Sequence, residues 1–89
     1  MAIRLDPDYA RAYLNRGMAY ERIGNLQQAV EDFSKAIEFE PGEGKLYYIR
    51  GLAHRRIGMP QEALQDLQRA AALGYRSAGE TLRSLRIDW

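Results

Sequence analysis

The sequence repeats itself with a period of 34 residues, and this repeat constrains the fold more than any other feature of the chain. Residues 10–43 aligned with residues 44–77 share eleven identical positions. The identical pairs are Tyr13/Tyr47, Arg16/Arg50, Gly17/Gly51, Ala19/Ala53, Arg22/Arg56, Ile23/Ile57, Gly24/Gly58, Gln27/Gln61, Ala29/Ala63, Asp32/Asp66 and Ala36/Ala70. The register extends backwards through the pairs Ala2/Ala36, Ile3/Ile37 and Pro7/Pro41. We therefore expect an array of repeated units, opening within the tail of an earlier unit.

Each unit is predicted to form two helices separated by a glycine turn, at Gly24 in the first unit. The expected helices cover residues 8–22, 26–39, 44–57, 60–73 and 77–85. Asn25 with Gln28, and Ser77 with Glu80, have the spacing of capping boxes, so side-chain caps are expected at those two helix starts. The alternation typical of strands is absent, which predicts an all-α fold.

Small residues occur where the two helices of each unit are expected to cross, because a small side chain lets two helix backbones approach closely. They are Gly17, Ala29 and Ala36 in the first unit, and Gly51, Ala63 and Ala70 in the second. Larger side chains are expected to fill the space around these crossings: Tyr13, Tyr20, Ile23, Leu26, Phe33, Ile37, Tyr47, Ile57, Leu64 and Leu67. His54 stands where Tyr20 stands in the first unit, which predicts a packed histidine rather than a catalytic base.

Composition excludes several classes of function. The chain has 89 residues, enough for one domain, with 13 Lys and Arg against 12 Asp and Glu. That near balance argues against a strongly basic nucleic-acid module. The absence of cysteine excludes disulfides and thiolate metal sites, and a single histidine leaves no metal-ligand signature. No cofactor or metal is expected. No apolar run is long enough to span a membrane, and a cytoplasmic location is expected.

The residues of the first unit resemble the tetratricopeptide repeat (TPR) family. All eight signature positions match: Tyr13, Gly17, Tyr20, Gly24, Ala29, Phe33, Ala36 and Pro41. The second unit matches at Tyr47, Gly51, Gly58, Ala63 and Ala70, and departs from the pattern at His54, Leu67 and Tyr75. The resemblance implies a right-handed superhelical stack of antiparallel helix pairs. In this division, residues 1–9 are the tail of a preceding repeat, 10–43 and 44–77 are two full repeats, and 78–89 are a capping helix.

The resemblance also implies that the first helix of each repeat lines a concave groove that binds peptides or proteins. The predicted groove residues are Arg11, Leu14, Asn15, Met18, Arg22, Lys45, Tyr48, Ile49, Leu52, Arg55 and Arg56. Five of them are cationic, and Glu21 is the one carboxylate on the same face. A cationic groove with an apolar strip suits an acidic peptide or a chain's terminal carboxylate. The alternative interpretation is that the cations only solvate the face and that Leu14 and Met18 belong to the core.

Co-chaperones of this family hold the terminal carboxylate of heat-shock chaperones with a clamp of Lys, Asn, Asn, Lys and Arg. Asn15 and Lys45 match two of these five positions, whereas Ile49 stands where the arginine belongs. The resemblance to the clamp is therefore partial, and the sequence predicts peptide binding more firmly than it predicts this particular ligand.

The sequence thus predicts a non-catalytic protein- or peptide-binding module. The alternative is a structural unit that extends a scaffold or self-associates. A homodimer through the open N-terminal edge is one form of this alternative, because the first repeat exposes a face that normally packs on a neighbour. An RNA-binding helical repeat is disfavoured, because residue pairs such as Asn15 and Ile49 do not recur at fixed repeat offsets.

Overall fold

The computed structural model describes residues 7–85, and this part of the chain consists of five helices with no strand. The helices are α1 (Pro7–Arg22), α2 (Leu26–Phe39), α3 (Gly44–Ile57), α4 (Pro60–Ala72) and α5 (Arg76–Ser84). They agree with the predicted elements to within one or two residues at each end. The all-α prediction is confirmed for the described residues.

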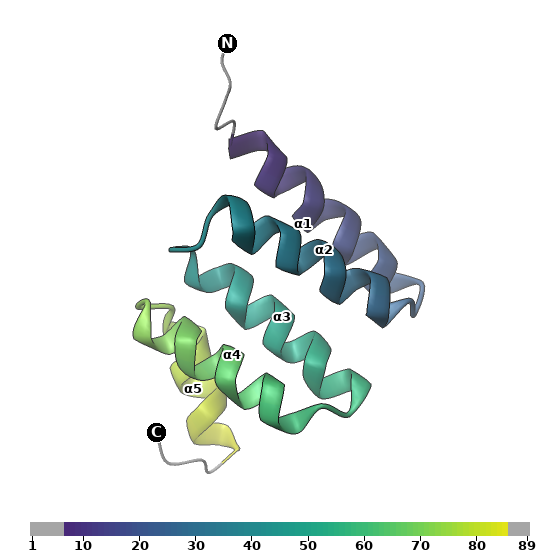
Figure 1. Cartoon of the computed structure of the whole chain (residues 1–89). Coiled ribbons are helices and arrows are strands. Elements are labelled where there is room, and N and C mark those ends of the chain that lie inside the picture. The colour runs from purple at the N-terminus through teal and green to yellow at the C-terminus, as the bar shows by residue number, and fades with distance from the viewer. Residues whose placement is uncertain (1–6, 86–89) are drawn as a thin grey trace.

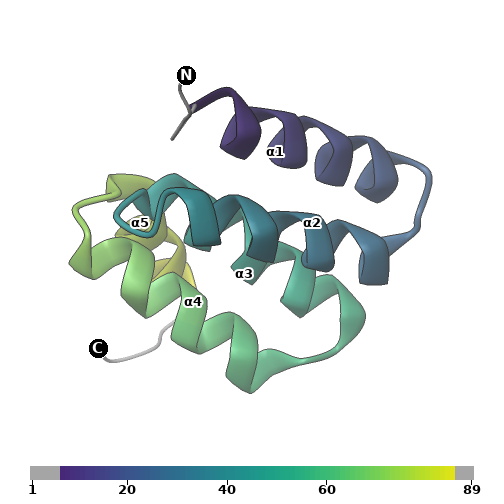
Figure 2. The same cartoon turned by 45° about the horizontal axis from the view of Figure 1, so that its top comes forward.

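The helices form a stack of antiparallel hairpins, in which α1 packs on α2 and α3 packs on α4. The second helix of the first hairpin, α2, also packs on α3, and α5 packs on α4. Figures 1 and 2 show α1 at one end of this stack and α5 beside α4 at the other. Because each helix contacts mainly its neighbours in sequence, the molecule is a one-dimensional array.

The turns within the hairpins depend on glycine. Gly24 and Gly58 have φ values of 86° and 92°, in the left-handed region that other residues adopt at a cost. Each therefore ends the first helix of its hairpin, as predicted, and lets the chain reverse direction. The helix crossings are also as predicted. Ala29, Ala36 and Ala70 are completely buried, and a Cβ on Gly17 would lie 2.6 Å from the ring of Phe33.

The capping predictions were wrong. Asn25 occupies the N-cap position of α2, but its side chain makes no capping hydrogen bond. The N-cap of α5 is Tyr75 rather than Ser77, and it also makes no side-chain bond. Relative to the 34-residue period, α4 ends one residue early, and the turn between α4 and α5 is one residue shorter than the turn between α2 and α3, so α5 begins two residues early.

Two predictions about individual side chains have different outcomes. Ile23 was expected to fill the core but is 76% exposed. It lies at the C-terminal end of α1, where no described helix covers it. His54 is buried, as predicted. The predicted helix tail over residues 1–9 lies mostly outside the described residues, as does Trp89.

Candidate functional site

A shallow depression of about 220 Å³ lies between α1 and the start of α3. Its lining includes Arg11 and Leu14 from α1 and Lys45 from α3, so three of the predicted groove residues converge here. Glu40 and Glu43, from the turn between α2 and α3, line the same depression. The turn carboxylates were not assigned to the groove from the sequence. They place negative charge beside the two cations.

A larger depression, of about 460 Å³, lies between α3 and α5. Its α3 side is formed by three predicted residues, Tyr48, Leu52 and Arg55. The sequence analysis treated α5 only as a cap and did not predict that it contributes to the site. The residues that line this side of the depression are Ser77, Glu80, Thr81, Ser84 and Leu85. The signal available in the sequence was the polar side of the amphipathic α5 helix. The candidate site therefore extends one helix beyond the two hairpins.

Tyr48 forms part of the wall of the larger depression and is fixed by a second tyrosine. Its ring centroid lies 5.1 Å from that of Tyr75, with the planes tilted by 48°. Tilted aromatic pairs at this separation are favourable because the edge of one ring faces the electron-rich face of the other. Tyr48 is consequently half-buried rather than projecting freely, and it offers an already positioned surface to a ligand.

The other predicted groove residues have different environments. Asn15, Met18 and Arg22 are exposed on α1 and line neither of these two depressions. Ile49 packs against the buried cluster that contains Phe33. Leu14, which lines the smaller depression, also packs against this cluster. Leu14 and Ile49 therefore contribute to the core as well as to the predicted face.

The predicted groove residues are surrounded by more negative charge than the sequence analysis indicated, so the face formed by α1, α3 and α5 carries charges of both signs. Arg56 Nη1 donates a hydrogen bond to Glu21 Oε2 at 3.2 Å, which ties α3 to α1. Arg55 shares its depression with Glu80. The cations Arg11 and Lys45 are exposed, but Glu40 and Glu43 lie in the same depression. The face thus presents charges of both signs around half-buried apolar side chains.

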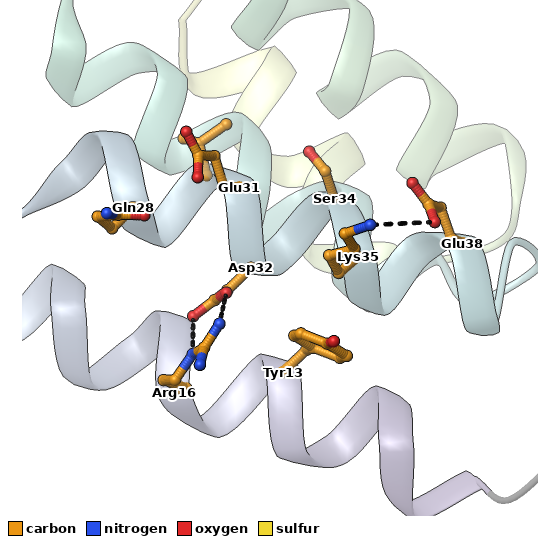
Figure 3. A pocket seen from close by; sticks show the side chains of 9 residues that line it. Tyr13, Arg16, Gln28, Glu31, Asp32, Ser34, Lys35 and Glu38 are labelled. Atoms are coloured by element: carbon orange, nitrogen blue, oxygen red, sulfur yellow. Dashed lines mark hydrogen bonds and ion pairs between the residues drawn. The ribbon is translucent and has the colours of Figure 1, made fainter.

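Each hairpin is held by an arginine–aspartate pair that repeats with the 34-residue period. Arg16 donates from Nε and Nη2 to the two carboxylate oxygens of Asp32, both at 2.8 Å (Figure 3). Arg50 does the same with Asp66, at 2.9 and 2.8 Å. These hydrogen bonds favour the charged guanidinium and raise the pKa of both arginines. The bidentate geometry fixes the distance and rotation of the paired helices.

The second pair is part of a larger polar network. His54 Nδ1 lies 2.9 Å from Asp66 Oδ2, and both side chains are buried. Ser34 Oγ, on α2, accepts a further hydrogen bond from Arg50 Nη1 at 3.0 Å. Asp66 therefore receives three hydrogen bonds, and Arg50 connects the first hairpin to the second. This network gives the buried histidine a hydrogen-bonding partner.

These observations define a helical-repeat protein, in which similar antiparallel hairpins stack through a shared apolar core. Residues 10–43 match the family model of the tetratricopeptide repeat. This segment is therefore a tetratricopeptide repeat, and the resemblance inferred from its signature residues is confirmed. The family is a protein-interaction fold and is generally non-enzymatic.

Comparison with solved structures supports the same fold. A structure described as the second TPR of Spaghetti (RPAP3) bound to HSP90 peptide SRMEEVD superimposes with a TM-score of 0.75. The two sequences are 21% identical, and the alignment covers 91% of this chain and 83% of the other. A search of curated proteins found no match. Within residues 7–85, no helix has both the length and the apolar character needed to cross a membrane.

Proposed function

We propose that the chain is a peptide-binding module whose ligand lies across α1, α3 and α5 and is an acidic or C-terminal peptide segment. The observation that carries the proposal is the convergence of predicted residues on two depressions of one face. Arg11 and Lys45 line one depression, and Tyr48, Leu52 and Arg55 line the other. Cations beside half-buried apolar side chains suit a peptide with both acidic and apolar residues.

The structural neighbour gives independent support. It has the same fold, and its bound peptide, SRMEEVD, contains three acidic residues. In this chain, Asn15 and Lys45 fit a carboxylate clamp, but Ile49 packs into the core where the clamp has an arginine. We therefore propose recognition of acidic side chains mainly through Arg11, Lys45 and Arg55 rather than a complete clamp.

We also propose that residues 44–77 are a second repeat and that residues 78–89 act as its cap, with residues 1–9 as the tail of a preceding repeat. The main support is the pair Arg50–Asp66, which has the geometry of Arg16–Asp32. Leu82, on α5, is completely buried, which fits a helix that covers the end of the stack.

The test is a titration of the isotope-labelled chain with the peptide SRMEEVD by proton–nitrogen NMR, at low and moderate salt. We expect the signals of Arg11, Lys45, Tyr48 and Arg55 to shift, with an affinity that falls as salt rises. Arg11→Glu and Lys45→Glu should each weaken binding about fivefold, since reversing one exposed charge changes the free energy by about 1 kcal/mol.

Two controls make the result specific. Lys35→Glu makes the same charge change on the exposed side of α2, away from the proposed face, and should leave the affinity unchanged. The peptide SRMQQVN keeps the length but removes the acidic side chains, and should bind more weakly. Equal affinity for both peptides would refute acidic recognition, even if binding to the face persisted.

A second candidate function is structural: the chain extends a scaffold, or forms a homodimer, through its N-terminal edge. The exposed apolar side chains at that end favour it. Tyr9 and Ile23 are more than half exposed, and Phe39 is 43% exposed. Sedimentation velocity tests the homodimer, because its mass must rise with protein concentration. A constant monomer mass would exclude the homodimer.

A further inference from the structure

Serine and threonine are rare in this chain, and most of them gather on one side of α5. The sequence contains four such residues: Ser34, Ser77, Thr81 and Ser84. Ser34 accepts a hydrogen bond from Arg50, and the other three all line the depression between α3 and α5. Their spacing of four and three residues places them on one side of a helix. We refer to Ser77, Thr81 and Ser84 as the hydroxyl row.

The packing of α5 holds the hydroxyl row in place. On another side of this helix, Ala78 and Leu82 are completely buried, and α5 packs on α4. The residue before the helix, Tyr75, contacts Tyr48 of α3 with a ring-centroid separation of 5.1 Å. Contacts with two other helices therefore fix the position of α5. A ligand meets hydroxyl groups on a backbone that is already ordered, so binding costs little conformational freedom.

The hydroxyl row can accept hydrogen bonds from a ligand. Ser77 and Thr81 are half-buried, and Ser84 is exposed. Within residues 9–85, the hydrogen bonds between side chains include none from these three residues. A hydroxyl in a helix can donate its proton to the carbonyl four residues earlier, and it then still has lone pairs that accept a bond. The row therefore offers acceptors whichever way its protons point.

Charge alone does not select the occupant of this depression, because its two charged residues have opposite signs. Arg55 of α3 can pair with an acidic side chain, but Glu80 of α5 lines the same depression and balances its charge. The apolar part of the lining consists of Tyr48, Leu52 and Leu85. Uncharged acceptors beside an apolar surface suit the main-chain N–H groups of a peptide, which are donors at every residue except proline.

The length of the hydroxyl row matches a short stretch of extended chain. At a rise of about 1.5 Å per residue, Ser77 and Thr81 are about 6 Å apart along α5, and Ser77 and Ser84 are about 10.5 Å apart. In an extended peptide, which rises about 3.3 Å per residue, N–H groups on one edge recur about every 6.6 Å. Ser77 and Thr81 therefore have the spacing of two such groups, and the whole row spans about three extended residues.

We propose that the hydroxyl row binds the main chain of an extended peptide segment, with Ser77 and Thr81 accepting hydrogen bonds from two of its N–H groups. This inference rests on the proposed function and adds α5 as a wall that binds the ligand independently of its sequence. Arg11 and Lys45 line the other depression, which borders the same helix α3. One depression therefore recognises acidic side chains, and the other recognises the peptide backbone.

The probe is the peptide SRMEEVD, titrated into the full isotope-labelled chain and observed by proton–nitrogen NMR. We expect the signals of the hydroxyl row to shift with the same dissociation constant as those of Arg11 and Lys45. Thr81→Val replaces the hydroxyl by a methyl group of similar size and should weaken binding about threefold, the usual effect of one neutral hydrogen bond. Thr81→Ser keeps the hydroxyl and should restore most of that affinity. Circular dichroism checks that both variants fold.

Two further comparisons separate main-chain hydrogen bonds from charge and from packing. The loss caused by Thr81→Val should be the same at low and moderate salt, whereas the loss caused by Lys45→Glu should shrink as salt rises. Versions of SRMEEVD with a single N-methylated amide each lack one main-chain donor. One of them should bind the parent chain about threefold more weakly than SRMEEVD does, but should show no such loss with Thr81→Val, because both changes remove the same bond.

The outcomes distinguish this inference from the proposed function. If SRMEEVD shifts Arg11 and Lys45 but binds Thr81→Val as tightly as the parent chain, the hydroxyl row is not part of the binding surface, and the proposed function stands without it. Equal losses in Thr81→Val and Thr81→Ser, or an N-methylation loss that persists in Thr81→Val, would also overturn the inference. No binding of SRMEEVD to the parent chain would overturn the proposed function and this inference with it.

Discussion

The two arginine–aspartate pairs allow the same substitution to be made in two environments of one molecule. Asp66→Ala removes three hydrogen bonds and leaves the half-buried Arg50 and the buried His54 without their shared acceptor. Breaking a buried pair in this way typically costs 3–5 kcal/mol, and we expect about 3 kcal/mol here because Arg50 retains some exposure. Asp32→Ala removes two hydrogen bonds from Arg16, which is mostly exposed and regains water.

Urea unfolding at pH 7, followed by circular dichroism, measures both variants. With a slope of about 1–1.5 kcal/mol per molar urea for a chain of this size, Asp66→Ala should lower the midpoint by about 2–3 M. Asp32→Ala should lower it by less than half as much. Both variants replace Asp by Ala in a helix, so the volume removed and the change in helix propensity are the same. The difference between the two midpoint shifts therefore reports the deeper burial of the Arg50–Asp66 pair and its additional contact with His54. Equal midpoint shifts would refute this reasoning.

Two further predictions concern packing, and both use thermal or urea unfolding. Gly17→Ala should destabilise the chain by about 1–2 kcal/mol, because the cost of overpacking against the buried Phe33 ring exceeds the gain in helix propensity. The control is Gly42→Ala, whose added methyl group would meet no atom within 4 Å and which should be nearly neutral. Gly17→Ala as stable as the parent chain would show that the ring moves aside freely. Leu82→Ala should cost about 2–4 kcal/mol if α5 is an integral part of the stack, whereas the exposed neighbour Arg83→Ala should have little effect. A negligible effect at Leu82 would contradict its role in covering α4.

Most of the fold could be predicted because the repeat period, the turn glycines and the small crossing residues all indicate the same hairpin. Gly17 and Ala29 specify close approach, and Gly24 requires a left-handed turn. The capping predictions were wrong because spacing alone does not determine where a helix starts. Because α4 ends early and the turn after it is short, α5 begins at Arg76 and Ser77 lies inside the helix.

The candidate site was harder to predict because it depends on contacts between units. Nothing local indicates that Glu40 and Glu43 share a depression with Arg11, or that Arg56 is bonded to Glu21 across two helices. The salt bridge within each hairpin could have been inferred. Arg16 and Asp32 recur together as Arg50 and Asp66, and paired recurrence of opposite charges indicates contact.

The linear order of the stack has a consequence for how the molecule opens. Among the described residues, α1 packs chiefly on α2 and α5 packs chiefly on α4, whereas α3 packs on both α2 and α4. Local unfolding is therefore expected to begin at the two end helices, with the amides of α3 among the slowest to exchange with solvent. The order of α1 and of α5 should accordingly respond most to what binds beside them. A partner that binds beside either helix would oppose its local unfolding, which would be measured as slower amide exchange along that helix.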